Sequence, residues 1–307
     1  MKIAIIGAGA MGSIYGGHLS LHNEVYLVDT NQSVVDQINE SGLRLLENGQ
    51  DVMYHPTAVT STEGLGEMDL VILFVKALFS KAALSANRGI IGSDTYVLTL
   101  QNGSGHEDIL SEFVDQEHII IGTTEDNGAV LEAGYVRHGG EGKTNVGMLT
   151  EDKNGMLPAV KASFDCCGFQ VRIHENIQEL IWDKLMTNVS LSAVTGVLQV
   201  KMGYIAANPY AWNLTSQLVK EAVAVAGGLG LTFDEEEVLE KVRTTSQNNP
   251  EGITSICADI VAGRKTEVDT ISGSVVRAAK KSGVSAPTHE MVVNIIHALE
   301  GKETKTP

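Results

Sequence analysis

The chain has 307 residues, of which 43% are hydrophobic and 20% charged, and its formal net charge is −16 at pH 7. This length suffices for two domains of ordinary globular composition, whereas the strong negative charge argues against nucleic acid or an anionic membrane surface as a partner. All apolar runs are shorter than the roughly 18 residues of a membrane span, and the N-terminus does not resemble a signal peptide.

The first 29 residues have the pattern of a dinucleotide-binding βαβ unit. Two short apolar runs, at 2–6 and 24–28, predict buried parallel strands, and residues 13–22 predict a helix between them. The first strand leads into a G-x-G-x-x-G segment made of Gly7, Ala8, Gly9, Ala10, Met11 and Gly12. Its glycines allow a tight turn, close approach of a pyrophosphate, and close packing of helix on strand. Asp29 follows the second strand, where an acid binds ribose hydroxyls.

Strands then alternate with helical patterns. We expect a helix over 34–41, a hairpin of 43–47 and 51–54 that turns at Asn48-Gly49, and strands over 68–75, 95–100 and 118–121. This alternation implies a parallel sheet with right-handed crossovers, whose ligands gather beyond the carboxyl ends of the strands. Lys76, Asn102 and an expected turn at 122–124 fall at those ends.

The pattern changes near residue 175. Before it, short β-like segments at 136–138 and 144–148, a helix over 160–167 and an edge strand over 169–173 are expected, with His138 structural or solvent-facing. From residue 177 strand signals vanish and helical periodicity runs almost to the polar tail 301–307, which we expect to fray. We therefore predict an α/β, Rossmann-type dinucleotide-binding domain over 1–174, followed by an all-α domain over 175–307 for substrate and dimer contacts.

The cysteines indicate a reduced, cytoplasmic protein. Cys166, Cys167 and Cys257 fit neither a disulfide framework nor a zinc spacing, and we expect no metal site.

A polar row stands out in the helical half. Lys184, Asn188 and Ser192 are spaced by four, which places them on one face of a helix. Burial among apolar neighbours would lower the pKa of the lysine toward the range where it delivers a proton near neutral pH. A lysine whose stem merely packs along the helix is the alternative reading. Residues 264–269, taken alone, suggest the solvated start of a helix with Thr266 as its cap.

The whole chain, over about residues 1–297, resembles the ketopantoate reductase (2-dehydropantoate 2-reductase) family. The matching segments are Gly7–Gly12, Val75-Lys76, Gln101-Asn102-Gly103, Gly122-Thr123-Thr124, Trp182-x-Lys184-x-x-x-Asn188, Ser255, Gly263-Arg264-Lys265-Thr266-Glu267-x-Asp269, and Gly283 with Pro287. The resemblance implies NADPH-dependent reduction of 2-dehydropantoate to (R)-pantoate, toward pantothenate and coenzyme A, in a cleft between a Rossmann domain and a helical domain.

The resemblance also implies a role for each matching residue. Lys184 looks like the general acid, and Glu267 like the carboxylate that orients the substrate. The expected substrate contacts are Asn188, Ser192, Ser255 and Asn102. The expected cofactor contacts are Lys76, Asn102 and Glu267, together with the glycine segment and Asp29. A 2-oxo acid is the expected small-molecule partner, and a homodimer stays open.

Several departures from the family pattern leave alternatives open. Gly252, Ser192 and Ser272 stand where the family often has asparagine, so a reductase of another branched 2-oxo acid is an alternative. A β-hydroxyacid dehydrogenase and a non-catalytic NAD(P) sensor are further ones. Asp29 with no Lys or Arg at 30–33 favours NADH, whereas the family habit favours NADPH.

Overall fold

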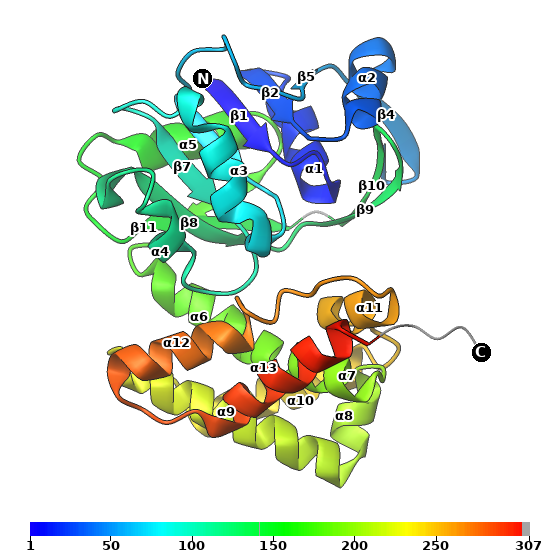
Figure 1. The fold of residues 1–307 in the computed structure, drawn as a ribbon, viewed down its shortest axis with the longest axis vertical. Helices are drawn as coiled ribbons and strands as arrows, with labels where there is room; N and C mark the ends of the chain where they lie inside the picture. The colour runs from blue at the N-terminus through cyan, green and yellow to red at the C-terminus, as the bar shows by residue number, and fades with distance from the viewer. Residues whose placement is uncertain (141, 303–307) are drawn as a thin grey trace. The chain divides into compact units, whose positions relative to one another are not determined.

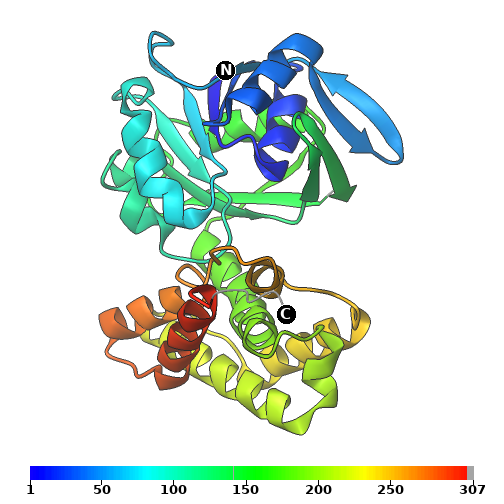
Figure 2. The ribbon, with the colours of Figure 1, turned by 45° about the vertical axis from the view of Figure 1, so that its right-hand side comes forward.

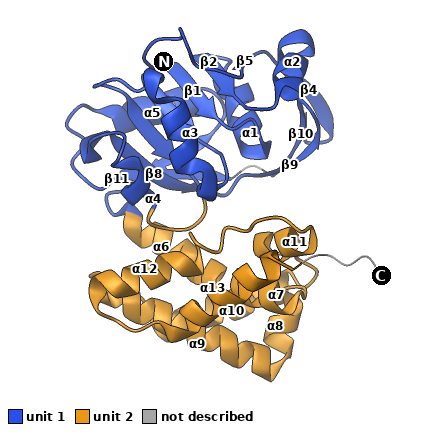
Figure 3. Cartoon of the chain, viewed as in Figure 1, with its two compact units in different colours: residues 1–101, 106–177 blue, residues 102–105, 178–307 orange. Residues whose placement is uncertain are grey.

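The chain forms two compact units, drawn in two colours in Figure 3. The computed structural model describes residues 1–140 and 142–302, so most of the tail expected to fray lies outside it. Unit 1 comprises residues 1–101 and 106–177, and unit 2 comprises residues 102–105 and 178–307. The predicted α/β part followed by a helical part is confirmed. None of the helices in the described ranges is long and apolar enough to cross a membrane.

Unit 1 is built on an eight-stranded sheet of order β12-β11-β8-β7-β6-β1-β2-β5. Its strands are β1 (Lys2–Ile6), β2 (Glu24–Val28), β5 (Thr57–Val59), β6 (Leu70–Leu73), β7 (Tyr96–Thr99), β8 (Ile119–Thr124), β11 (Lys143–Met148) and β12 (Gln170–Ile173). Neighbours are parallel except β8 and β11. Because β1 lies between β2 and β6, the strand order reverses there, and ligands bind at such a switch point.

One predicted turn is wrong. Residues 122–124 continue β8 and pair with β11 instead of turning. A Cβ atom on Gly122 would lie 2.0 Å from the carbonyl oxygen of Asn145, so the glycine permits close strand pairing.

A second sheet, of order β4-β3-β10-β9, was not foreseen. The predicted hairpin is confirmed as β3 (Leu43–Glu47) and β4 (Gln50–Tyr54), which turn through positive φ angles at Asn48 and Gly49. β10 (Tyr135–Gly140) joins β3 in parallel and β9 (Asn127–Glu132) antiparallel, so segments far apart in sequence lie side by side (Figure 2).

Helix α1 (Ala10–Leu19) packs on strands of both sheets (Figure 1). Two consecutive glycines make this possible. A Cβ on Gly16 would lie 2.6 Å from the Leu27 side chain of β2, and one on Gly17 would lie 3.1 Å from the Tyr54 ring of β4. Adjacent small residues, which point about 100° apart around the helix, therefore let both sheets approach it closely.

The other helical segments of unit 1 are short. They are α2 (Gln32–Ser41), α3 (Ser80–Ala86), α4 (His106–Leu110), α5 (Met156–Asp165) and the 3₁₀ turns η1 (Ala77–Phe79), η2 (Arg88–Ile90) and η3 (Gln116–His118). α2 ends at Gly42, as predicted, because that residue adopts a φ of 84°.

The described residues of unit 2 form helices joined by turns and loops, with no strand among them. Its segments are α6 (Ile177–Thr187), a π-helical segment (Asn188–Ser192), α7 (Ala193–Leu198), α8 (Gly203–Ala207), α9 (Pro209–Gly228), α10 (Glu235–Asn248), α11 (Ser255–Val261), α12 (Ser272–Ser282) and α13 (Pro287–Glu300). Caps separate these helices: the Asn208 side chain caps the start of α9, and Gly283 ends α12 in the left-handed region.

Glu221 of α9 caps the start of α13. Its carboxylate accepts hydrogen bonds from the backbone amides of Thr288 and His289 and, at 2.5 Å, from the Thr288 hydroxyl. Only 6% of Glu221 is exposed. A buried carboxylate at a helix N-terminus satisfies donors that would otherwise lack partners.

We expect Glu221→Gln to lower the free energy of unfolding by about 1–3 kcal/mol, because an amide cannot replace all these charge-assisted bonds. Urea denaturation measures the change. Glu290→Gln, which removes an exposed charge from the first turn of the same helix, is the matched control. Equal losses in the two variants would contradict the capping role.

Candidate active site

The glycine segment has the geometry of a phosphate loop. Gly7 adopts a φ of 103°, and a Cβ atom on Gly12 would lie 1.8 Å from the carbonyl oxygen of Gly7. Gly9 is the N-cap residue of α1, and a Cβ there would have no atom within 4 Å. Gly7 thus makes the turn, and Gly9 leaves open space beside the backbone. Gly12 lets the first turn of the helix pack against the loop. The first-turn amides of a helix lack intrahelical partners, so the N-terminus of α1 beside this space suits an anion.

Asp29 is tied to this loop. Its Oδ2 accepts the Ala8 amide at 2.8 Å, and its Oδ1 accepts the Asn31 amide at 2.9 Å. A carboxylate oxygen has more than one acceptor site, so each can still accept a ribose hydroxyl. The side chain is half-buried at the carboxyl end of β2, where dinucleotide enzymes place their ribose-binding acid.

The segment that carries Lys76 lies beside the loop. A Cβ on Gly7 would lie 3.0 Å from the amide nitrogen of Val75. Gln101 Nε2 donates to the Val75 carbonyl at 2.5 Å and to Ser80 Oγ at 3.0 Å, which joins the ends of β6 and β7. Unit 1 therefore brings the glycine loop and Lys76 to the same end of the sheet.

In unit 2, the turn that contains Asn102 adjoins the turn that contains Glu267. The Ser104 amide donates to the Thr270 carbonyl at 3.0 Å, and the Thr270 amide donates to the Glu267 carbonyl at 3.1 Å. Gly103 has a φ of 100°, and a Cβ there would lie 2.0 Å from the Thr270 carbonyl oxygen. Only glycine permits this approach.

The predicted helical start at 264–269 is wrong. These residues form turns, and α12 begins at Ser272. Thr266 is buried rather than capping a helix, and its amide and hydroxyl donate to Glu300 Oε1 at 2.8 and 2.7 Å. Burial raises the pKa of Glu300, but hydrogen bonds from Thr266, His297 and Lys265 outweigh it and lower that pKa to about 2. Glu300, whose side chain is 1% exposed, thus holds the residue that precedes Glu267.

Lys184 and Asn188 lie where an α-helix changes to a π-helix. Lys184 is on α6, Asn188 begins the π segment and Ser192 ends it. A π turn takes more residues than an α turn, and four residues lie between the lengths of the two turns, so a spacing of four still brings the three positions near one side of the helix. Lys184 and Asn188 are half-buried, whereas Ser192 is 6% exposed. Such π segments often occur at functional sites.

Ser255 is held beside the π segment. It is the exposed first residue of α11, which packs on α7 and on the π segment. Thr254 Oγ1 lies 2.7 Å from Thr195 Oγ1, and a Cβ on Gly196 would lie 2.4 Å from the Ile256 side chain. Unit 2 thus gathers Asn188, Ser192 and Ser255 around one helix junction.

Two of the departures from the family pattern lie in tight surroundings. A Cβ on Gly252 would lie 2.5 Å from Asn249 Nδ2 and 2.8 Å from Met202 Sδ. Ser272 is fully buried, and its hydroxyl has no hydrogen-bond partner among the described residues. These surroundings do not suit either residue to direct substrate contact.

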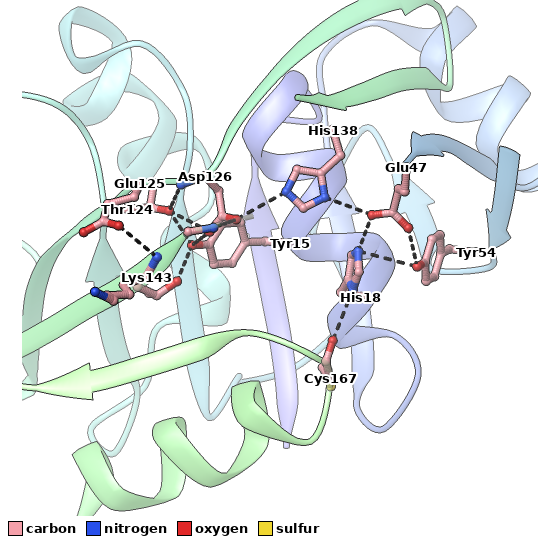
Figure 4. A network of polar contacts seen from close by, with 12 residues as sticks. Tyr15, His18, Glu47, Tyr54, Thr124, Glu125, Asp126, His138, Lys143 and Cys167 are labelled. Atoms are coloured by element: carbon pink, nitrogen blue, oxygen red, sulfur yellow. Dashed lines mark hydrogen bonds and ion pairs between the residues drawn. The ribbon is translucent and has the colours of Figure 1, made fainter. Parts of the chain in front are cut away.

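A buried polar cluster in unit 1 was missed (Figure 4). His138 is not solvent-facing: its side chain is 6% exposed and lies between Asp126 and Glu47. Hydrogen bonds to Asp126 and Glu47 raise the pKa of His138 to about 9. The partners are distant in sequence, and the two isolated carboxylates gave no local signal.

Both parts of the chain match one protein family. Residues 3–151 match the family described as "Ketopantoate reductase PanE/ApbA", and residues 176–300 match its C-terminal domain. The 2-dehydropantoate 2-reductase of Pyrococcus horikoshii is 33% identical over 98% of both chains, and that of Halobacterium salinarum is 28% identical over 98% of this chain and 99% of its own.

Solved structures agree over the full length. The ternary structure of a D-mandelate dehydrogenase with NADH and anilino(oxo)acetate superposes with a TM-score of 0.89 at 32% identity, covering 98% of each chain. A putative 2-dehydropantoate 2-reductase from Enterococcus faecalis superposes with a TM-score of 0.82 at 31% identity, also covering 98% of each.

Proposed function

Because the chain belongs to the ketopantoate reductase family, we propose that it reduces the ketone of 2-dehydropantoate to (R)-pantoate with NADH or NADPH. One observation supports this most: a complete dinucleotide loop occurs in the same chain as Lys184 and Asn188 at a π junction. The reaction is a step toward pantothenate and coenzyme A. We place it in the cytoplasm, in keeping with three free cysteines.

The proposed chemistry assigns each residue a task. When bound, the reduced nicotinamide supplies the hydride, and negative charge then builds on the ketone oxygen. The Lys184 ammonium stabilises that charge and gives the oxygen its proton. Glu267 orients the substrate from its fixed turn, and Asn188 and Ser255 hold its hydroxyl and carboxylate groups. The first-turn amides of α1 hold the pyrophosphate, with Lys76 and Asn102 as further contacts.

A second candidate substrate is a 2-oxo acid with an aryl group. The D-mandelate dehydrogenase is as similar in sequence as the pantoate enzymes, and its complex contains NADH. Ser192 stands where the family often has asparagine, so the pocket would offer one amide group fewer to a polar substrate. The β-hydroxyacid dehydrogenase alternative is weakened, since both parts match the ketopantoate reductase family.

The test is the oxidation of NADH and of NADPH by a panel of 2-oxo acids that includes 2-dehydropantoate and phenylglyoxylate, the oxo acid of mandelate. The highest kcat/KM with 2-dehydropantoate would support the proposal, and the highest with phenylglyoxylate would support the second candidate. Tight cofactor binding without turnover of any acid would favour the sensor alternative.

Glu267→Gln is expected to lower kcat/KM for the oxo acid by about 10- to 100-fold, because it removes one charge-assisted contact to the substrate. The Kd for reduced cofactor should change far less, since the pyrophosphate is assigned to α1. Steady-state kinetics and fluorescence titration measure the two effects. Asp269→Asn, an exposed carboxylate on the same turn, is the control. A loss of cofactor affinity with unchanged KM would reject the assignment.

A further inference from the structure

Three side chains of unit 1 that the proposed reaction does not use converge on one point (Figure 4). They are His18 of α1, Glu47 at the end of β3, and His138 of β10. Glu47 Oε1 lies 2.6 Å from His18 Nε2 and 3.0 Å from His138 Nδ1. One nitrogen or oxygen atom of each residue lies within 4.8 Å of the other two, so a single ion could touch all three.

A second hydrogen bond orients each of the two histidine rings. His18 Nδ1 lies 3.1 Å from the Cys167 carbonyl oxygen, and His138 Nε2 lies 3.2 Å from Asp126 Oδ1. Donation to these acceptors keeps a hydrogen on each far nitrogen, so an ion that displaces the hydrogens between the near nitrogens and Glu47 meets the lone pairs of both near nitrogens. Metal-binding histidines are characteristically held in this way by a carbonyl or a carboxylate.

The carboxylate is oriented in the same way, because the Tyr54 hydroxyl donates to Glu47 Oε2 at 2.9 Å. An open cavity of about 550 Å³ adjoins the cluster, and Glu47, His138 and Asn127 are among its lining residues. The cavity gives an ion a path from solvent. Ligand atoms around a tetrahedral zinc lie about 3.3 Å apart, so Glu47 Oε1 has to move by less than about 1 Å to admit the ion.

We propose that His18, Glu47 and His138 bind a divalent transition-metal ion, with Zn²⁺ as the best match. Two imidazoles and one carboxylate are a common zinc set, and a water from the cavity takes the fourth position. The ion replaces the protons that the two rings share with Glu47, and these protons pass to solvent. Since the ligands come from α1, β3 and β10, the ion joins the helix of the phosphate loop to the second sheet.

The ligands are far apart in sequence, so no spacing motif could reveal this set. The expectation of no metal site rested on cysteine spacing alone.

Isothermal titration of the chelator-treated full-length protein with Zn²⁺ tests the proposal. We expect one ion per chain with a Kd below about 10 µM, release of protons that depends on buffer ionisation, and a melting temperature that rises with Zn²⁺ concentration. Co²⁺ should give the visible absorption bands of a four-coordinate nitrogen and oxygen site. A stoichiometry far below one ion, or octahedral Co²⁺ bands, would show that the cluster is an ion-pair network only.

Variants locate the site. Glu47→Gln keeps the size of the side chain and can still form a hydrogen bond with Tyr54. His18→Asn removes one imidazole ring. Each variant should weaken Zn²⁺ binding at least tenfold. His22→Asn, an exposed histidine just beyond α1, should bind as the wild type does. Circular dichroism confirms that each variant is folded. Unchanged binding in both cluster variants, or equal loss in His22→Asn, would overturn the assignment.

Discussion

Lys184→Ala is expected to lower kcat by about 10²- to 10⁴-fold, the usual effect of removing a positioned general acid. The alanine variant loses both the charge that stabilises the developing alkoxide and the proton that neutralises it. The Kd for reduced cofactor should remain close to that of the wild type, because the phosphate loop is in unit 1 and Lys184 is in unit 2. Single-turnover oxidation of the bound cofactor measures the chemical step directly.

Two further variants make this result specific. Lys184→Arg keeps the positive charge but holds its proton too tightly to donate it, so we expect an activity between wild type and alanine. Lys241→Ala removes a surface lysine that pairs with Asp183, the neighbour of Lys184, and should leave kcat within about twofold. If Lys184→Ala retains more than about half of the wild-type kcat, Lys184 is not the acid.

The wild-type protein is expected to prefer NADH over NADPH by about 5- to 150-fold in kcat/KM, and Asp29→Ala to abolish most of that preference. Asp29 would meet the 2′-phosphate of NADPH, which carries about −1.5 to −2 charges. Two unit charges about 4 Å apart repel each other by about 4 kcal/mol at an effective dielectric constant of 20. Screening by solvent should reduce the repulsion between Asp29 and the phosphate to roughly 1–3 kcal/mol. Residues 30–33 offer no cation to offset it, and Lys76 is the nearby cation that could.

The structure suggests a second variant for this test. Asp29 also accepts the Ala8 amide, so removing the side chain could disturb the loop as well as the charge. Asp29→Asn keeps an oxygen for that amide while removing the charge, and should also gain activity with NADPH relative to NADH. Asp36→Asn, an exposed carboxylate on α2, serves as control. A wild type that prefers NADPH, or a ratio that neither Asp29 variant changes, would show that Asp29 does not face the ribose.

The parts of the fold that were predicted depend on contacts between residues close in sequence. Strand β1, the glycine segment, α1 and β2 form one local unit, and each glycine has a steric role that its position alone reveals. The hairpin at Asn48-Gly49 was predictable for the same reason, because positive φ angles select those residues.

The missed features depend on long-range contacts. β9 is mostly exposed, so it has little of the alternation that marks a half-buried strand. The turn at Glu267 is set by Glu300, far along the chain, and local charge made it look like a helix start. The π segment was hidden because spacing by four fits an ordinary helix equally well.

The short segment Asn102–Gly105 has a consequence for engineering. It belongs to unit 2 although it lies within the sequence of unit 1, and its Ser104 amide is bound by Thr270, which is synthesised much later. A fragment that ends at residue 177 would therefore carry one turn of unit 2 without the partner that shapes it. An exchange of the helical unit between relatives has to transfer residues 102–105 with it, because Gly103 and Thr270 are matched as a pair.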